Sequence, residues 1–380
     1  MGKTFLILGG YGTTGSLIAR YLLEETDVQL ILAGRNAEIA ETLADVLNGQ
    51  YGSDRVSAMR VDAADPQDLR MAFDRAGLVV VASSTAEYVE TVARAALEAR
   101  IDYVDLQYST AKIEALKSMQ AQIEEAGCCF ITDGGFHPGL PAALVRYAAT
   151  HFERLEKATV ASVIKVDWSS LSLSPATVEE MVREFQEFQM VYYQDGRWIK
   201  TGWTDMKRFD FGLEFGEQPC AAMLLEEMRA LPEMIPSLQE TGFFVGGFNW
   251  FVDYLVLPVS LAVLRIWPQK AVKPAGKLIL WGLNRFSKPP YRTILLLEAS
   301  GWKAGEHTTM HVRVHHEDGY VMTAAPVVAC LLQYLDGSIK GPGLWLQANV
   351  VEPCRLLEDM ERLGVMIETQ AQGTSRDKTW

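Results

Sequence analysis

The fold of this chain is decided by the stretch Phe5-Leu-Ile-Leu-Gly-Gly10-Tyr-Gly-Thr-Thr-Gly15. An apolar run leads into Gly10, Gly12 and Gly15, and a helical pattern follows over about residues 13–25. In a strand–turn–helix with this spacing, the first glycine permits a tight turn, the second lets backbone approach a pyrophosphate, and the third lets the helix pack against its strand. The helix start also directs its amides and positive dipole end at phosphates. The stretch therefore predicts a dinucleotide site, with a purely structural turn as the alternative interpretation.

The end of the second predicted strand, over about residues 28–33, distinguishes between the two nicotinamide cofactors. An NAD site usually carries Asp or Glu there to accept the ribose hydroxyls. This chain has Arg35 and Asn36 instead. The guanidinium fork suits a 2′-phosphate, and the missing carboxylate removes the repulsion that would exclude one. NADP(H) is therefore favoured over NAD(H), although Arg35 could also be a solvated residue beside a helix that Asn36 caps.

Strands and helices alternate over the first 150 residues. Apolar runs predict strands over residues 5–8, 28–33, 56–61, 78–82, 103–106 and 128–132, each followed by a helical pattern. Such alternation is typical of an α/β fold, a doubly wound parallel sheet of the Rossmann type, which binds ligands beyond the carboxyl ends of its strands.

Those strand ends supply the remaining cofactor candidates. Asp62 is placed to contact adenine or to cap the next turn, and the small side chains after the fourth strand could line the nicotinamide side. The predicted cofactor-binding residues are Gly10, Tyr11, Gly12, Thr13, Thr14, Gly15, Arg35, Asn36, Asp62, Ala63, Ser83 and Ser84.

The loop after the sixth strand offers a candidate acid–base group. His137 lies among glycines and prolines at the nicotinamide end, and the pKa range of histidine suits proton transfer. Asp133 could orient the ring, and Tyr108 is a weaker candidate. The alternative is that His137 only hydrogen-bonds loop backbone.

Beyond residue 150 the parallel rhythm stops. Alternating segments predict a second α+β domain with a mostly antiparallel sheet. The elements expected there are strands at 158–168, 293–301, 308–316 and 320–322, a hairpin over 191–199, a helix opened by Ser174-Pro175 and a helix over 327–335. The expected domains are residues 1–150, 151–322 and 323–380, with the last segment returning to the first domain.

Residues 243–266 are mostly apolar and rich in aromatics. Asp253 and a central proline make a membrane span costly. Burial, or cover by a second copy in a homodimer formed through the second domain, is the favoured interpretation. Peripheral contact with a membrane or lipid is the alternative.

Composition excludes several other classes of protein. The chain has 380 residues, enough for two cores, and its net charge of −13 would repel nucleic acid. No Cys or His spacing is typical of zinc, so no metal site is predicted. Because the first residues enter a strand directly, no signal peptide is expected and the localisation is expected to be cytoplasmic, with membrane association as the alternative.

The quoted motifs resemble the saccharopine dehydrogenase-like family, which includes saccharopine reductases, homospermidine synthases and carboxynorspermidine dehydrogenases. They are Gly9 to Gly15, Leu32-Ala-Gly-Arg35, Tyr103-Val-Asp-Leu106 and Gly135-Phe-His-Pro-Gly139. The resemblance implies hydride transfer between NADP(H) and a C=N bond, and a substrate domain that often dimerises. It also implies that arginines of the second domain bind substrate carboxylates, for which Arg292 and Arg313 are the candidates.

Three hypotheses about function follow. The first is an NADP(H)-dependent oxidoreductase that acts on an amino-acid-derived imine. The second is a reductase of a more hydrophobic carbonyl or alkene near a membrane, favoured by the apolar stretch and by Trp198, Trp203, Phe209 and Phe211. The third is a non-enzymatic NADP(H) sensor or scaffold.

Overall fold

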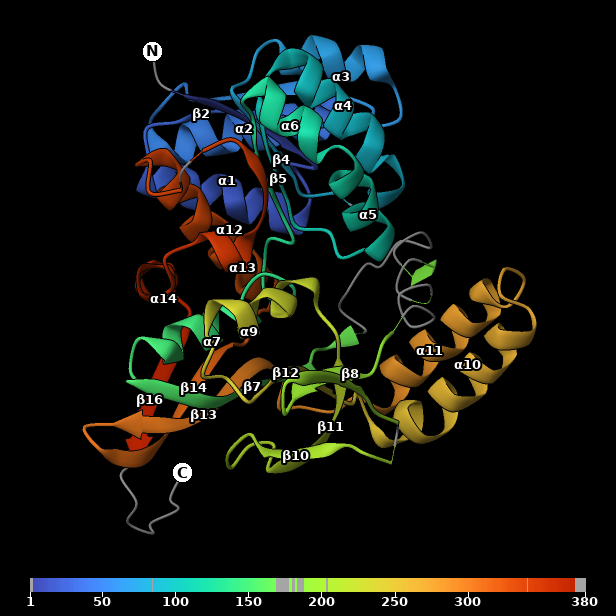
Figure 1. Ribbon diagram of the computed structural model, residues 1–380. Coiled ribbons are helices and arrows are strands. Elements are labelled where there is room, and N and C mark those ends of the chain that lie inside the picture. Colours follow the sequence, from blue (N-terminus) through green and yellow to red (C-terminus); the bar gives the residue numbers. More distant parts are fainter. Residues whose placement is uncertain are drawn as a thin grey trace. The chain divides into compact units, whose positions relative to one another are not determined.

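A computed structural model describes residues 3–83, 85–168, 178–179, 182, 188–202, 204–339 and 341–372. The chain divides into two compact units. The first contains residues 1–143 and 320–364, and the second contains residues 144–319 and 365–380 (Figure 1). The first unit breaks at residue 143 and resumes at residue 320, whereas the expected boundaries were 150 and 323.

The first unit contains a seven-stranded, all-parallel sheet in the order β15-β6-β5-β4-β1-β2-β3. The doubly wound sheet predicted from the sequence is confirmed, and one further strand, β15, lies at its edge. The strands are β1 Thr4–Leu8, β2 Gln29–Gly34, β3 Val56–Arg60, β4 Leu78–Val81, β5 Asp102–Asp105, β6 Cys129–Thr132 and β15 Gly343–Leu346.

Helices lie on both faces of this sheet. Figure 1 shows α3, α4 and α6 on one side and α1 and α12 on the other. The helical segments are α1 Thr13–Glu25, α2 Ala37–Tyr51, α3 Pro66–Phe73, η1 Ala86–Tyr88, α4 Val89–Ala99, α5 Thr110–Ser118, α6 Gln120–Ala126, α12 Gly319–Leu335, α13 Gln347–Val350 and α14 Pro353–Arg362, while α7 Pro141–Ala149 crosses into the second unit.

Local sequence explains why several of these elements form where they do. All four residues of β4, Leu-Val-Val-Val, are buried, as expected for a strand covered on both faces. The side chain of Asn36 caps α2 and that of Ser109 caps α5. Asp65 caps α3, whose first residue is Pro66, a position where the missing amide costs nothing.

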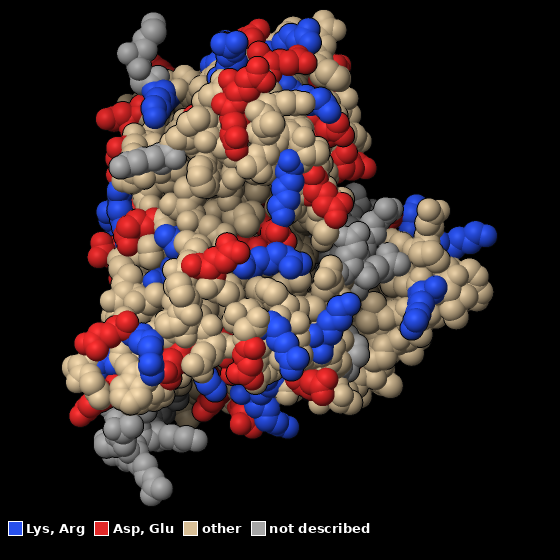
Figure 2. Space-filling view, viewed as in Figure 1, with Lys and Arg blue, Asp and Glu red and all other residues tan. Residues whose placement is uncertain are grey.

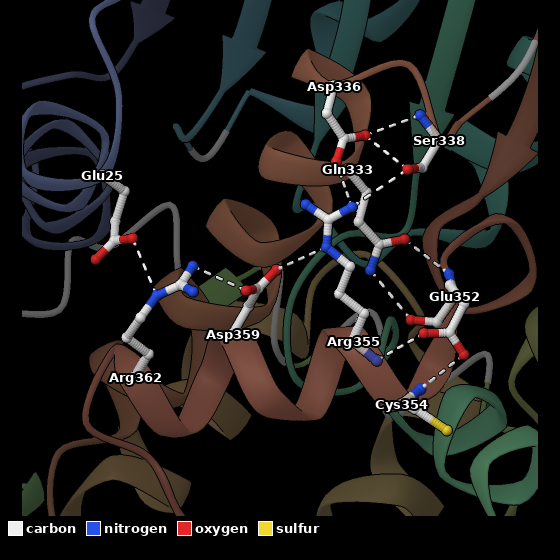
Figure 3. A network of polar contacts seen from close by, with 9 residues as sticks. All are labelled: Glu25, Gln333, Asp336, Ser338, Glu352, Cys354, Arg355, Asp359 and Arg362. Atoms are coloured by element: carbon white, nitrogen blue, oxygen red, sulfur yellow. Dashed lines mark hydrogen bonds and ion pairs between the residues drawn. The ribbon is translucent and has the colours of Figure 1, made fainter.

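The segment 320–364 is attached to the first unit by a polar network (Figure 3). Gln333 and Glu352 exchange two hydrogen bonds, of 3.0 and 2.7 Å, and the Glu352 carboxylate also caps α14. Arg362 bonds Asp359 at 2.8 Å on its own helix and Glu25 at the end of α1 at 3.0 Å. These contacts join α12 and α14 to the N-terminal part of the chain.

The second unit contains a nine-stranded sheet with β10-β11-β12-β7-β13-β14-β16 as its main order, and β8 pairs with β12 and β9. Only the β12–β7 pairing is parallel among the strands described. The strands are β7 Arg154–Lys165, β8 Val191–Gln194, β9 Arg197–Lys200, β10 Lys207–Asp210, β11 Glu217–Met223, β12 Glu240–Gly246, β13 Arg292–Lys303, β14 Glu306–His316 and β16 Met366–Gln372. The mostly antiparallel second sheet is confirmed.

Two expectations about the C-terminal region are wrong. The short strand expected at 320–322 is the first turn of α12, because the apolar run continues as a helix in which 11 of 17 residues are buried. The last segment does not return entirely to the first unit, since β16 pairs with β14 in the second sheet. The helix expected from Ser174-Pro175 falls outside the described residues.

The apolar stretch 243–266 is not one helix. Its first residues complete β12, and the rest form the π-helical turn η4 Val252–Val256 and α10 Leu257–Ile266. A second helix, α11 Val272–Phe286, packs beside α10, and the remaining helical turns of this unit are η3 Glu226–Ala230 and α9 Leu231–Met234. In the part of the chain that is described, no helix has the length and apolar character needed to cross a membrane.

Candidate active site

The turn between β1 and α1 has the geometry that its glycines predict. Gly9 adopts φ +85°, a conformation that L side chains rarely adopt. A Cβ on Gly10 would lie 2.9 Å from the carbonyl oxygen of Ile7, and a Cβ on Gly15 would collide with the carbonyl oxygen of Gly9. Around Gly12, by contrast, the nearest atom to an added Cβ is 3.2 Å away. The packing therefore requires Gly10 and Gly15, while Gly12 lies at the more open position, where backbone can approach a ligand.

The start of α1 is suited to a phosphate. Gly12 occupies the N-cap position and provides no side-chain hydrogen bond, so the first amides of the helix, at Thr13, Thr14 and Gly15, remain available to an anion. Arg35 follows β2, is exposed, and makes no ion pair with any described residue. Uncapped amides and an unpaired guanidinium beyond adjacent strands are the donors that the phosphates of NADP(H) need.

The polar groups of two residues near Arg35, Tyr11 and Asn36, are hydrogen-bonded within the chain. The ring of Tyr11 lies directly over Gly34, where any Cβ would overlap it, and its hydroxyl accepts a 3.1 Å bond from the backbone amide of Asn36. The Asn36 side chain is engaged in capping α2. The side chain of Asn36 therefore acts as a helix cap, which was the alternative interpretation of this residue.

The residues after β3 and β4 lie at the same carboxyl edge of the sheet. Asp62 Oδ1 accepts a 3.1 Å bond from the amide of Ala64, so one oxygen caps the turn, and Ala63 is buried. After β4, Ser83 Oγ lies 3.0 Å from Thr85 Oγ1, and the Gln107 amide donates to the carbonyl of Ser83 and to Thr85. Ser84 lies outside the described residues.

A buried ion triad joins the ends of β5 and β6, and the sequence analysis did not anticipate its lysine. Lys112, on α5, is fully buried, and its Nζ lies 2.6 Å from Asp105 Oδ1 and 2.8 Å from Asp133 Oδ1. Nζ also donates to the carbonyl of Gln107, and Thr132 bonds the other oxygen of Asp105 at 2.8 Å. Burial favours the neutral amine, but the two carboxylates outweigh it and raise the pKa of Lys112.

The loop from Asp133 to Gly139 is held from several sides. Gly135 and Gly139 adopt φ +116° and +118°, and a Cβ on Gly139 would lie 2.7 Å from the amide nitrogen of Gly135. The buried Gln347, on α13, donates to the carbonyls of Gly135 and Gly139 at 3.4 and 3.2 Å. Asp133 thus belongs to the buried triad that anchors this loop, and Gln347 is a second anchor that sequence reasoning missed.

His137 lies on this anchored loop. Its ring centroid is 4.0 Å from that of Phe136, and burial lowers its pKa to about 4, so the imidazole is neutral at pH 7. Tyr108 follows β5 and is half-buried, directly before the residue that caps α5. Both side chains belong to segments beyond the carboxyl ends of adjacent strands, where ligands of such sheets bind.

Arg292 and Arg313 lie on one face of the second sheet. Glu214 Oε2 is 3.2 Å from Arg292 and 4.0 Å from Arg313, and Glu368 is 3.7 Å from Arg313. Both arginines are largely buried, and the neighbouring His315 has a pKa lowered by burial and by Arg313. The two arginines therefore share a carboxylate of the chain itself.

Comparisons with known proteins agree with this geometry. Residues 5–131 match the model of the saccharopine dehydrogenase NADP binding domain. Carboxynorspermidine synthase of Vibrio alginolyticus is 22% identical over 394 residues, which cover 94% of each chain. Carboxyaminopropylagmatine dehydrogenase of Synechocystis is 22% identical over 275 residues, 70% of this chain and 67% of that protein.

The fold has a solved relative. Saccharopine dehydrogenase (L-Glu forming) of Saccharomyces cerevisiae superposes with a TM-score of 0.66 at 16% identity, covering 98% of this chain and all of the other. The fold and the glycine turn are typical of NADP-binding oxidoreductases with a Rossmann unit and a mixed-sheet unit. Within that class, residues 5–131 are similar to the NADP binding domain of saccharopine dehydrogenases, as the sequence motifs indicated.

Proposed function

We propose that this protein transfers hydride between NADP(H) and the C=N bond of an imine formed from an amino-acid-derived amine. The observation that carries the proposal is the uncapped glycine turn with the unpaired Arg35 beside it, followed along the same sheet edge by the anchored loop of His137. The names of the two relatives support the substrate class, because both specify carboxylated amines.

The residues of the site divide into three tasks. The amides of Thr13 to Gly15 hold the pyrophosphate, and Arg35 binds the 2′-phosphate. Lys112 and Asp133 are positioning residues, because they fix the loop that carries His137. When bound, NADP(H) supplies or accepts the hydride.

His137 is the proposed acid–base group. In the direction of amine oxidation, the C–H bond breaks with its electron pair, and the nitrogen must also lose a proton to give C=N. A neutral imidazole is the form that takes up this proton, and burial keeps His137 neutral at pH 7. In the direction of imine reduction, the same nitrogen regains a proton, and His137 must first take that proton from solvent because its imidazole is neutral at pH 7. We expect His137→Asn to lower turnover by about 10²-fold while NADPH affinity stays within about twofold.

Arg292 and Arg313 are the proposed ligands of a substrate carboxylate. The half-exposed carboxylate of Glu214 lies 3.2 Å from Arg292 and 4.0 Å from Arg313, and a substrate carboxylate would take its place beside the two guanidinium groups. Arg292→Met should raise KM for carboxylated amines by about tenfold or more and leave the affinity for NADPH unchanged.

The hydrophobic-substrate hypothesis loses part of its support. Phe209 and Phe211 are buried in the core of the second unit, and so they do not supply a substrate surface. Trp198 packs against Tyr193, and Trp203 lies outside the described residues.

NADPH oxidation measured with a panel of aldehydes and keto acids plus carboxylated amines, against long-chain carbonyls and alkenes without amine, tests the proposal. Turnover that requires both the amine and the carbonyl is the expected result. Turnover of a long-chain carbonyl without amine would replace the proposal, and tight NADPH binding without turnover on any substrate would favour a sensor.

A further inference from the structure

The outer surface of the helical pair α10–α11 is unusually apolar. Figure 1 shows the two helices side by side, extending from the sheet of the second unit. One side of the pair packs into a core that includes Val256, Leu264, Ile279 and Leu283. Outside that core, the pair and the turn before α10 expose large apolar side chains: Trp250, Tyr254, Leu255, Val259, Ile266, Trp267, Leu278 and Trp281. We call this surface the hairpin face.

Most of the exposed apolar side chains fall on one stripe of each helix. On α10 and the turn before it, Leu255, Val259 and Ile266 recur at helical spacing, and on α11 Pro274, Leu278 and Trp281 do the same. Val259, Trp267 and Leu278 also line a shared open pocket of about 370 Å³. The apolar stripes of the two helices therefore meet on one side of the pair.

The charge of this segment is opposite to that of the protein. The whole chain carries a net charge of −13, but residues 247–290 contain a single acid, Asp253, and six cations: Arg265, Lys270, Lys273, Lys277, Arg285 and Lys288. Asp253 is half-buried and accepts a 3.0 Å bond from the amide of Phe248, and six cations against this one acid leave the segment with a formal net charge of +5. In Figure 2 the region at the right of the view is mostly tan with several blue side chains.

These cations are available to an external anion. Lys273 lies 3.7 Å from Glu179, while Arg265, Lys270, Lys277 and Arg285 form no ion pair with the residues that the structure describes. Lys270 lines the apolar pocket together with Trp267 and Leu278. A pocket with apolar walls and one ammonium group at its lining matches the chemistry of an acyl chain below an anionic headgroup.

We propose that the hairpin face docks on the surface of an anionic phospholipid membrane. Exposed Trp and Leu side chains interleaved with Lys and Arg are typical of helices that lie in the membrane interface, where apolar burial and attraction to anionic lipids act together. Trp267 and Ile266, at the bend between the helices, are 57% and 66% exposed and enter the interface first.

A second copy of the chain is the competing occupant of this face. In a two-fold symmetric dimer the same patch lies on both sides of the interface, so the five exposed cations of one α10–α11 pair would face those of the other. Like charges brought together in this way oppose association, whereas an anionic lipid surface neutralises them. The docking does not depend on the proposed reaction.

Sedimentation of the full chain with vesicles tests the proposal. The vesicles are phosphatidylcholine alone, or phosphatidylcholine with about 30 mol% phosphatidylserine, which gives the surface potential of an anionic leaflet. We expect binding to the anionic vesicles only, with a loss of binding as salt is raised. Equal binding to both vesicles, or binding to neither, overturns the proposal.

Two pairs of substitutions separate the apolar and electrostatic contributions. Ile266→Ser with Trp267→Ser, and separately Lys270→Glu with Lys277→Glu, should each weaken binding by roughly tenfold or more. The double variant Lys270→Glu with Lys277→Glu alters exposed side chains only, so it should fold. If it folds and binds the vesicles as the unaltered protein does, the proposal is overturned, even where the variant with two serines fails to fold. Far-ultraviolet circular dichroism and NADPH affinity report on folding, and neither depends on the hairpin face.

Matched controls come from α3 and its C-terminal end in the first unit. Met71→Ser changes an apolar side chain that is 50% exposed, and Arg75→Glu reverses an exposed cation. Both variants should bind vesicles like the unaltered protein. Light scattering without lipid tests whether a second copy covers the hairpin face. If the protein is a dimer, if the variant with Ile266→Ser and Trp267→Ser is a monomer, and if no vesicles are bound, then the hairpin face is a dimer interface and the membrane proposal is overturned.

Discussion

The buried triad gives the most quantitative prediction, for the substitution Lys112→Met. The lysine is fully buried, and its Nζ lies 2.6 and 2.8 Å from two carboxylates that are themselves buried. Methionine fills a similar volume but leaves Asp105 and Asp133 without a counter-ion. Removing one partner of a buried ion pair costs about 3–5 kcal/mol. We therefore expect the free energy of unfolding to fall by about 4 kcal/mol in urea titrations at pH 7.

A control and a rescue variant make this test specific. Lys117→Met alters an exposed lysine on the same helix and should change stability by no more than about 0.5 kcal/mol. Adding Asp105→Asn and Asp133→Asn to Lys112→Met removes the buried charges and should restore more than half of the loss. A loss below about 1 kcal/mol for Lys112→Met, or no recovery in the triple variant, would refute the reasoning.

Three further predictions concern residues of the first unit. Arg35→Asp should weaken NADPH binding by about tenfold or more and reverse the preference for NADPH over NADH, since it exchanges a hydrogen-bond donor to the 2′-phosphate for a repelling carboxylate. Calorimetry with both cofactors measures the two affinities, and an unchanged ratio of these affinities would count against the prediction. Gly15→Ala should destabilise the protein by about 1–3 kcal/mol in urea denaturation and weaken NADPH binding, because the added Cβ lies 2.9 Å from Cα of Gly10. The control is Gly49→Ala on α2, where the added Cβ meets nothing within 4 Å, and this variant should be neutral or stabilising in the same assay. Burial lowers the pKa of His137 from 6.5 to about 4, so between these pH values the unfolded chain binds a proton that the folded chain does not. Unfolding free energy should therefore fall between pH 6.5 and 4, by up to about 3 kcal/mol more than in His137→Asn, and superimposable pH profiles of the two proteins would contradict this.

The local signals in the first unit were strong enough to place its elements. The helix expected at 13–25 has those bounds, and the six strands differ from their expected ranges by one or two residues. Glycine spacing and continuous apolar runs are local properties, so they can be interpreted without knowledge of the tertiary contacts. The same holds for Arg35, whose place after β2 follows from strand and helix alone.

The sequence did not predict elements whose hydrophobic periodicity fits both a helix and a strand, or contacts between residues far apart in the chain. Tyr320-Val-Met322 is apolar and follows a turn, and a short apolar run of this kind does not distinguish a strand from a buried helix. The segment 366–372 becomes a strand only because β14 offers it an edge. A lysine at the start of a helix is usually exposed, so the sequence around Lys112 does not indicate burial. The available signal was that Asp105 and Asp133 lie at the ends of adjacent strands, where two buried carboxylates require a cation.

The proposal about substrate class depends on where the hydride goes. NADPH deuterated at the transferable position of nicotinamide C4 is incubated with the protein, a carboxylated amine and an aldehyde or keto acid, and the products are analysed by mass spectrometry. The proposal predicts one deuterium on the carbon of a newly formed C–N bond in a secondary amine, and none in product from reactions that lack the amine. Deuterium in an alcohol or in a reduced alkene, with none in an amine, would contradict it.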